Sequence, residues 1–137
     1  MSDKRKAAER TAWKWFSLWV RLRDASSCGV VQCFTCSTIK PFREMQAGHY
    51  RSQGARHGLK FNEKNCEPQC VSCNMYKSGN LAIYAERLIQ KHGTKIFDEL
   101  AIANQLFGRI SETGYRELAK KYRLLVQARA KEIGARI

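Results

Sequence analysis

Residues 33–80 read CFTCSTIKPFREMQAGHYRSQGARHGLKFNEKNCEPQCVSCNMYKSGN, and this stretch decides the fold because it contains two Cys-x-x-Cys pairs. Cys33 and Cys36 form the first pair, and Cys70 and Cys73 form the second. Each pair can form a tight turn whose backbone amides point at the sulfurs, and four thiolates complete a tetrahedral shell for Zn²⁺. The spacing therefore predicts one structural zinc site that joins two distant parts of the chain.

A redox function fits the cysteines less well than zinc. A thioredoxin-like motif is a single Cys-x-x-Cys pair at the start of a helix that follows a buried strand. Two pairs with a polar segment between them lack this arrangement. Cys28 and Cys66 lie outside the predicted site, and we interpret both as ordinary buried or half-exposed thiols. A ligand set that includes one of them stays open.

Histidine and asparagine follow the cysteines in a characteristic order. His49 lies between the two pairs, Asn65 lies just before the second pair, and Asn74 follows it directly. This order resembles the HNH endonucleases, in a variant with asparagine at the third position. Over residues 20–100 the chain resembles more narrowly the phage NinG (Rap) recombination nucleases. The segments that carry this resemblance are Cys33–Cys36, Met45–Tyr50, Leu59–Asn65, Gln69–Asn74 and Ser78–Asn80.

The resemblance implies a fold and a chemistry. The implied fold is α+β, a zinc-stapled ββα-metal core of treble-clef type with flanking N- and C-terminal helices. The implied activity is a metal-dependent DNA endonuclease in which His49 activates water and Asn74 helps to hold Mg²⁺ or Mn²⁺. Asn65 would orient the catalytic loop by bonding to the backbone or to His49, and its alternative is a cap on the next turn.

Phosphodiester hydrolysis explains why these residue types are needed. The reaction requires a base that is neutral near pH 7 and a cation that stabilises the leaving 3′ oxygen. An imidazole supplies the base without adding negative charge beside the phosphate. The cation should be a hard ion with oxygen ligands, separate from the sulfur-bound zinc.

The residues before the histidine depart from the usual pattern. Many HNH sites have an acidic residue or a second histidine immediately before the base, but this chain has Gly48. NinG-like proteins share this glycine and often have aspartate two positions before it, where this chain has Gln46. We therefore expect the ion to depend on Gln46, Glu44 or His57 in addition to the asparagine.

The charge of the chain predicts a polyanionic partner. Lys and Arg number 25 against 12 Asp and Glu, which gives a net charge of +13. Such a charge attracts nucleic acid by counterion release. The basic residues are dispersed along the chain and not gathered beside one apolar helix face, so DNA fits better than a membrane surface. The predicted phosphate contacts are Arg51, Arg56, Lys60 and Lys77, with solvated loop charge as the alternative.

The remaining patterns predict one domain, residues 1–137, made of three parts. They are an aromatic and basic N-terminal helix (1–25), a zinc-bound core (28–92) and C-terminal helices (94–137). A charged N-terminus and the lack of a long apolar run predict a cytoplasmic protein, in a bacterial host if the phage resemblance holds. Reduced thiols are the default there, which favours metal over disulfides.

The N-terminal helix carries Trp13, Trp15 and Trp19 on a very wide apolar face. This width predicts packing on the zinc module or on a partner subunit in a homodimer, in preference to base stacking. Arg21 and Arg23 at the helix end are interpreted as phosphate contacts or as solvated charges.

Further elements are predicted downstream of this helix. Val30-Val31 is expected to be a short strand, and residues 42–50 the second arm of a β-hairpin. Helices are expected at 81–92, from Phe97 to a stop at Gly108, and at 115–133.

The resemblance also implies a substrate class, namely branched or single-stranded recombination intermediates such as Holliday junctions and D-loops, with recombination proteins as partners. Two alternatives stay open. One is a noncatalytic, zinc-stapled DNA-binding accessory protein in which Gln46 and Gly48 are remnants of a lost site. The other is an RNA-binding module that uses the tryptophan helix.

Overall fold

A computed structural model describes residues 2–51 and 58–137 of the chain. Its elements are α1 (Asp3–Leu22), β1 (Val30–Gln32), β2 (Ile39–Pro41), the 3₁₀ turn η1 (Phe42–Glu44), β3 (Gln46–His49), β4 (Cys66–Gln69), the π-helical turn η2 (Ser72–Tyr76), α2 (Leu81–His92), α3 (Ile96–Gln105) and α4 (Glu112–Ile133). This mixed composition confirms the α+β class. The finer prediction of a ββα-metal core stays a prediction.

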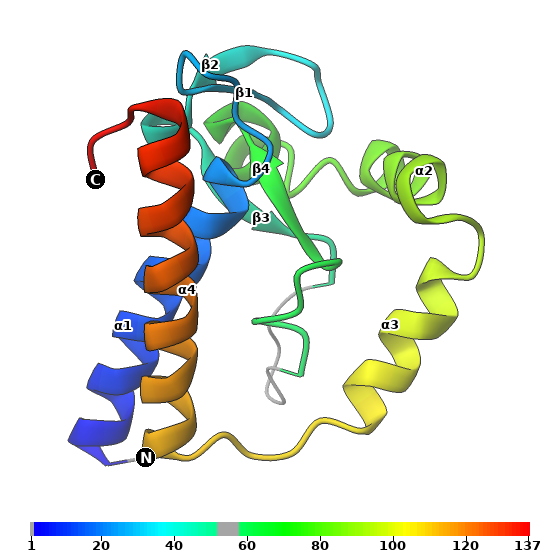
Figure 1. Cartoon of the computed structure of the whole chain (residues 1–137). Helices are drawn as coiled ribbons and strands as arrows, with labels where there is room; N and C mark the ends of the chain where they lie inside the picture. Colours follow the sequence, from blue (N-terminus) through cyan, green and yellow to red (C-terminus); the bar gives the residue numbers. More distant parts are fainter. Residues whose placement is uncertain (1, 52–57) are drawn as a thin grey trace.

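The first and last helices pack together over their whole length. α1 and α4 lie side by side and run in the same direction (Figure 1). Near the start of α1, Ala12 packs against Tyr115, and near its end Leu22 shares a buried cluster with Val126. The apolar stripes predicted for the two helices therefore cover one another, and together they form one side of the molecule.

The tryptophan face of α1 contacts the cysteine-bearing core. Trp15 and Trp19 pack against the cluster that contains Cys33 and Cys70, and Trp19 Nε1 donates a hydrogen bond to Glu63 Oε1 at 2.8 Å. Of the packing alternatives for this helix, contact with the zinc module is the one observed. The wide apolar face is thus used within the chain.

Two short antiparallel sheets carry the residues between the cysteine pairs. β1 pairs with β2, with Val31 opposite Lys40. β3 pairs with β4, with Gln46 opposite Gln69 at one end and His49 opposite Cys66 at the other. The first knuckle lies at the turn of the first sheet, and the second follows the last strand of the second sheet.

The hairpin predicted for residues 42–50 is wrong in its pairing. The partner of β1 is β2, and the chain then turns through η1 before β3 begins as the first arm of a different hairpin. Pro41, at the end of β2, has no amide hydrogen to continue the ladder. Phe42 is buried in the core and fixes the turn that follows.

The helix predicted at residues 81–92 is confirmed. Ser78, Gly79 and Asn80 all have positive φ values, which a right-handed helix cannot contain. α2 then begins at Leu81 and ends at His92, with Gly93 as its C-cap. α3 ends at Gln105, three residues before the predicted stop at Gly108.

α2 and α3 lie on the side of the strands away from α1 and α4 (Figure 1). They share a buried cluster that includes Tyr84, Leu88 and Leu100. The Tyr84 hydroxyl donates to the carbonyl oxygen of Gly48 at 2.7 Å, which ties α2 to the strand that carries the histidine. This contact positions one wall of the site described below.

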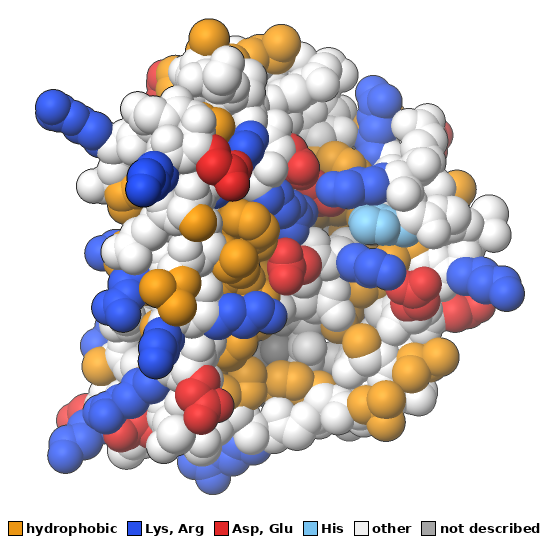
Figure 2. All heavy atoms as spheres, viewed as in Figure 1, with side chains coloured by type: hydrophobic (Ala, Val, Ile, Leu, Met, Phe, Trp, Pro, Cys, Tyr) orange, Lys and Arg blue, Asp and Glu red, His pale blue; other side chains and the backbone are white. Residues whose placement is uncertain are grey.

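Lys and Arg side chains dominate the face formed by α1 and α4, and further basic side chains surround α2 (Figure 2). Acidic side chains are fewer and lie between these basic groups. The net charge of +13 is thus spread over several elements. No helix in the described part of the chain is long and apolar enough to span a membrane.

Candidate functional site

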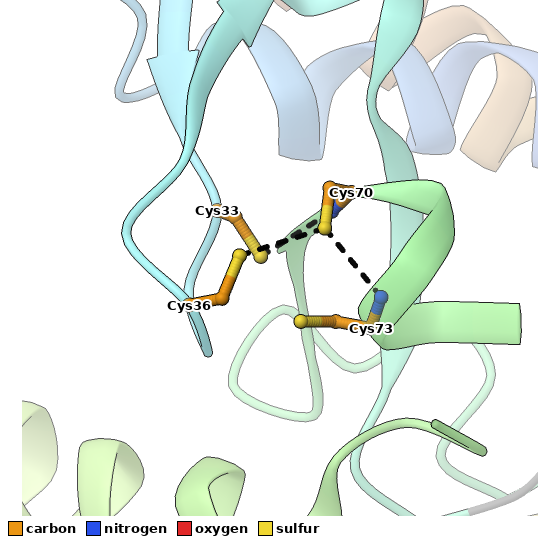
Figure 3. A group of neighbouring side chains, drawn as sticks. All are labelled: Cys33, Cys36, Cys70 and Cys73. Atoms are coloured by element: carbon orange, nitrogen blue, oxygen red, sulfur yellow. Dashed lines mark hydrogen bonds between the residues drawn. The ribbon is translucent and has the colours of Figure 1, made fainter. Parts of the chain in front are cut away.

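The four predicted zinc ligands come together from the two knuckles. The sulfurs of Cys33, Cys36, Cys70 and Cys73 all lie within 4.8 Å of one another (Figure 3). The amide of Cys70 donates to Cys33 Sγ at 3.3 Å, and the amide of Cys73 donates to Cys70 Sγ at 3.5 Å. Four sulfurs at this spacing can hold a metal ion, and an all-sulfur shell with amide donors suits structural Zn²⁺.

The other two cysteines stand apart from this cluster. Cys28 is exposed before β1, and Cys66 is fully buried on β4, opposite His49. Burial raises the pKa of the Cys66 thiol, which keeps it protonated. Both therefore fit the interpretation as ordinary thiols. Among the described residues, the only group of three or more His, Cys, Asp or Glu side chains close enough to share a metal ion is the four-cysteine cluster.

His49 is held at the end of β3 with one ring nitrogen fixed. Its Nε2 lies 2.9 Å from the backbone carbonyl oxygen of Lys60. A carbonyl oxygen can only accept, so Nε2 carries the proton in the neutral ring and the lone pair is on Nδ1. The indole of Trp13 stacks on the imidazole, with 5.2 Å between ring centroids and 25° between planes.

The environment of His49 favours its neutral form. Burial lowers the pKa of the imidazole, and the positive charge of Lys60 lowers it further, while the hydrogen bond to the Lys60 carbonyl acts in the opposite direction. The net shift is below the ordinary value of 6.5. His49 is therefore a neutral, oriented base at neutral pH.

Asn65 bonds to the backbone at both ends of the loop that follows β3. It is fully buried, and its Oδ1 accepts from the amide of Arg51 at 2.9 Å. Its Nδ2 donates to the carbonyl oxygens of Arg51 at 3.1 Å and Leu59 at 3.2 Å. Of the alternatives, backbone bonding is observed, so Asn65 holds the loop beside His49.

Asn74 lies in η2, directly after Cys73, and its carboxamide is oriented by Gln46. Asn74 Nδ2 donates to Gln46 Oε1 at 2.7 Å. Asn74 Oδ1 lies 3.0 Å from the position that a Cβ atom would occupy at Gly48, the residue before His49. The predicted ligand oxygen of Asn74 therefore faces the strand that carries the predicted base.

Glycine at position 48 leaves room for a side chain from the neighbouring strand. A Cβ atom at Gly48 would lie 1.9 Å from Gln69 Oε1, which is a steric overlap. Sequence reasoning missed Gln69, and it assigned Trp13 only a packing role. The tight approach of Gly48 to β4 depends on strand pairing, for which the sequence carries no signal beyond the glycine itself.

The other predicted ligands of the catalytic ion are less well placed or lie outside the described residues. Gln46 already accepts the hydrogen bond from Asn74. Glu44 is exposed in η1, and within residues 2–51 and 58–137 its carboxylate makes no hydrogen bond or ion pair. His57 belongs to the residues that the structure does not describe.

The predicted phosphate contacts that the structure describes differ in solvent exposure and in whether an acidic side chain pairs with them. Arg51 is exposed and lines an open hollow of about 620 Å³ together with His49, Ser78 and Leu81. Lys77 is exposed at the end of η2. These two residues are the strongest candidates for DNA contact.

Of the other two predicted phosphate contacts, Lys60 is largely buried and Arg56 is not described. Lys60 Nζ forms an ion pair with Glu9 Oε1 at 2.9 Å, and its side chain is only 12% exposed. Its charge is therefore compensated inside the protein. Arg56 lies outside the described residues.

The arginines at the end of α1 bind groups of the protein itself. Arg21 Nη1 donates to the carbonyl oxygen of Phe42 at 3.2 Å. Arg23 Nη2 donates to the carbonyl oxygen of Cys66 at 2.7 Å and lies 3.1 Å from Glu67 Oε1. These guanidinium groups join α1 to η1 and β4. The Arg23 side chain is 12% exposed and paired with a buried carboxylate, so it fits neither interpretation. Arg21 is half-buried, and its contact with phosphate stays a prediction.

Comparison with known proteins gives related phage proteins. The profile of a family described as "Bacteriophage Lambda NinG protein" matches residues 2–132. The chain is 40% identical over 82 residues to "Protein ninG" of Escherichia phage lambda and 39% identical over 82 residues to "Protein ninG" of Salmonella phage P22. Each match covers 60% of this chain and 38% of the relative, so the chain spans well under half the length of these relatives. No solved structure gives a significant match.

Proposed function

Because the chain belongs to the NinG family, and because its predicted base is oriented, we propose that it is a metal-dependent DNA endonuclease of the HNH type. The observation that carries the proposal is the state of His49. Its Nε2 is occupied by the Lys60 carbonyl at 2.9 Å, and its pKa is lowered by burial. Nδ1 is thus the atom that takes the proton from the attacking water.

Each protein group has a separate task in this reaction. Trp13 stacks on the imidazole and Lys60 holds its second nitrogen, so the ring cannot turn away from the phosphate. Asn65 closes the loop after β3 through its backbone hydrogen bonds. Arg51 and Lys77 supply exposed positive charge for the DNA backbone.

The donor set beside His49 fits a hard divalent ion. Asn74 Oδ1 is a carboxamide oxygen, which is a ligand type that Mg²⁺ and Mn²⁺ accept, and Gln46 fixes its direction. When bound there, such an ion would stabilise negative charge on the scissile phosphate and the leaving 3′ oxygen. Since these protein ligands are uncharged, we expect weak binding that improves when DNA phosphate is present.

Zinc has a structural task in this proposal. The four thiolates bring the first knuckle against the second, and the second knuckle contains Cys73, the covalent neighbour of Asn74. Zinc binding therefore fixes the position of Asn74 relative to β3. We assign no step of the hydrolysis to it.

We further propose branched or single-stranded recombination intermediates, such as Holliday junctions and D-loops, as the substrate class. The support is the family relationship and a net charge of +13. Among the described contacts there is no dedicated base-reading element, so DNA shape and phosphate contacts would determine selectivity. Recombination proteins are the corresponding partners.

One observation favours a second candidate, a noncatalytic DNA-binding accessory protein. Position 48 is glycine and position 46 is glutamine, so the site lacks a carboxylate on β3. The RNA-binding alternative has less support, because the tryptophans of α1 are packed on the core and do not form a free stacking surface.

The test is cleavage of linear duplex, single-stranded and four-way-junction DNA by zinc-loaded protein with Mg²⁺, Mn²⁺ or EDTA. We expect divalent-dependent cleavage of the junction that His49→Ala abolishes while zinc content and DNA binding remain. His92→Ala is the matched control, since His92 is the last residue of α2 and Leu81, at the other end, lines the hollow with His49. DNA binding without cleavage under every ion would favour the accessory protein.

A further inference from the structure

Gln69 is a buried polar residue that the proposed reaction has not used. It is the last residue of β4, and its side chain is 0% exposed. Its Nε2 donates to the Gly79 carbonyl at 2.9 Å and lies 3.0 Å from Thr35 Oγ1. A carbonyl can only accept, so the contact with Gly79 fixes which end of the amide is nitrogen.

This orientation leaves Gln69 Oε1 without a hydrogen-bond partner among the described residues. Buried carbonyl oxygens in folded proteins nearly always have a partner, because leaving one unsatisfied costs free energy. The exception here lies beside the predicted base.

Gln69 Oε1 and a second carboxamide oxygen, Asn74 Oδ1, both lie close to Gly48. Gln69 Oε1 and Asn74 Oδ1 lie 1.9 Å and 3.0 Å from the position of a Cβ atom at Gly48. Asn74 presents its oxygen on this side because Nδ2 is bound to Gln46 at 2.7 Å. Two carboxamide oxygens with partial negative charge beside the same glycine are ligands of the type that a hard divalent ion accepts.

We propose that Gln69 Oε1 and Asn74 Oδ1 form a divalent-cation site, in which Gln69 replaces the ligand that a side chain at position 48 would supply. Gly48 is then required for space, since any larger residue there would collide with Gln69. Gln46 is a positioning residue that acts through Asn74. The role of this site in cleavage rests on the proposed function, but ion binding by the two carboxamides does not.

A competing arrangement needs no ion. If the Asn74 amide were rotated by half a turn, its nitrogen would face Gln69 Oε1 and its oxygen would face a rotated Gln46 amide. The three carboxamides would then form a closed hydrogen-bonded relay. This arrangement and the cation site predict opposite results when a divalent ion is added.

The first experiment uses the unaltered, zinc-loaded protein without DNA. Mn²⁺ is added while the side-chain amide signals of Asn and Gln are followed by ¹H–¹⁵N NMR. The cation site predicts that the NH₂ signals of Gln69 and Asn74 broaden first and that Mg²⁺ reverses the effect. Signals of Gln69 and Asn74 that stay sharp while Mn²⁺ is added would overturn the proposal in favour of the hydrogen-bonded relay.

Variants then assign the ligand by Mn²⁺ titration monitored by electron paramagnetic resonance. Gln69→Met and Asn74→Ala should each weaken Mn²⁺ binding by about tenfold or more, and Gln69→Glu should strengthen it. His49→Ala is the control, because it removes the base and leaves both carboxamides in place. Equal Mn²⁺ affinity in Gln69→Met and the unaltered chain, with zinc content intact, would overturn the assignment of Gln69.

The two proposals fail in distinguishable ways. Mn²⁺ binding that depends on Gln69, in a protein that cuts no DNA, would refute the nuclease and support the cation site. Divalent-dependent cleavage with Mn²⁺ binding that Gln69→Met does not alter would support the nuclease and refute the role of Gln69.

Discussion

His49 Nε2 lies 2.9 Å from the backbone carbonyl oxygen of Lys60, and the ammonium group of the same lysine forms an ion pair with Glu9. One residue therefore acts on the imidazole in two ways. Its carbonyl selects the tautomer, and its charge lowers the pKa of the ring in addition to the larger effect of burial. The two effects can be separated, because a substitution of Lys60 removes the charge and keeps the carbonyl.

The pH dependence of cleavage follows from this relationship. Protonated His49 cannot act as a base, and burial lowers its pKa, so the rate should rise with pH and reach its plateau at a lower pH than an ordinary histidine would give. Lys60→Gln should raise the pKa of His49 and move the acid limb to higher pH. The ¹H NMR titration of the imidazole in both proteins measures this directly. An unchanged pKa in Lys60→Gln would show that the ammonium charge does not reach the ring.

The same shift predicts how the stability depends on pH. The unfolded chain has a histidine pKa near 6.5, whereas the folded pKa is lower, so the unfolded state binds more protons between these two values. The contribution of His49 to the free energy of unfolding is complete above pH 6.5 and falls as the pH drops toward the folded pKa. In His49→Gln this part of the pH dependence of denaturant unfolding should disappear.

Trp13 should matter for the base as well as for packing. Trp13→Leu removes the ring that stacks on His49 at 5.2 Å and exposes the imidazole to water. We expect a raised His49 pKa, slower cleavage and a loss of about 1–2 kcal/mol in stability, measured by NMR, kinetics and urea unfolding.

The matched control is Trp15→Leu, which alters a tryptophan of the same helix that packs on the cysteine-bearing clusters. It should lower stability to a similar degree and leave the pKa of His49 unchanged. Equal effects of both variants on that pKa would indicate a general loosening of α1.

Zinc removal should disconnect the two knuckles and misplace Asn74. In Cys73→Ser the zinc content should fall well below one ion per chain, since structural sites need all four ligands. Divalent-dependent cleavage should be lost with it. Cys28→Ser is the control, because Cys28 is exposed and lies outside the cluster. Loss of zinc in Cys28→Ser would contradict the ligand set.

The sequence predicts those parts of the structure that depend on local patterns. Cys-x-x-Cys spacing indicated a metal cluster, and apolar periodicity located α1, α2 and α4 to within a few residues. Arg23 was misinterpreted because its partners, Cys66 and Glu67, lie far from it along the chain. A basic residue at a helix end has the same local pattern whether it binds phosphate or a buried carbonyl.

The site beside His49 shows the same limit. Strand pairing places β3 against β4 and brings Gln69 over Gly48. The packing of α1 on these strands brings Trp13 over the imidazole. These contacts join residues far apart along the chain. Their partners follow from tertiary packing, which the order of residue types leaves undetermined.

Salt dependence should rank the basic residues by how free their charges are. The DNA association constant falls as salt is added, and each phosphate contact that is lost reduces the steepness of log K against log salt concentration by about one, because fewer counterions are released. Arg51→Ala removes an exposed charge that lines the hollow, and Lys77→Ala removes an exposed charge next to Ser78 in the chain, so each should produce this change in junction-DNA binding. Lys60→Gln should leave the slope unchanged, since the Lys60 ammonium is paired with Glu9 at 2.9 Å and the side chain is 12% exposed.

Fluorescence anisotropy between about 50 and 200 mM salt measures all three slopes. A lower slope in Lys60→Gln would mean that DNA breaks the Glu9 pair and recruits Lys60, whereas unchanged slopes in Arg51→Ala and Lys77→Ala would place the DNA on another basic face.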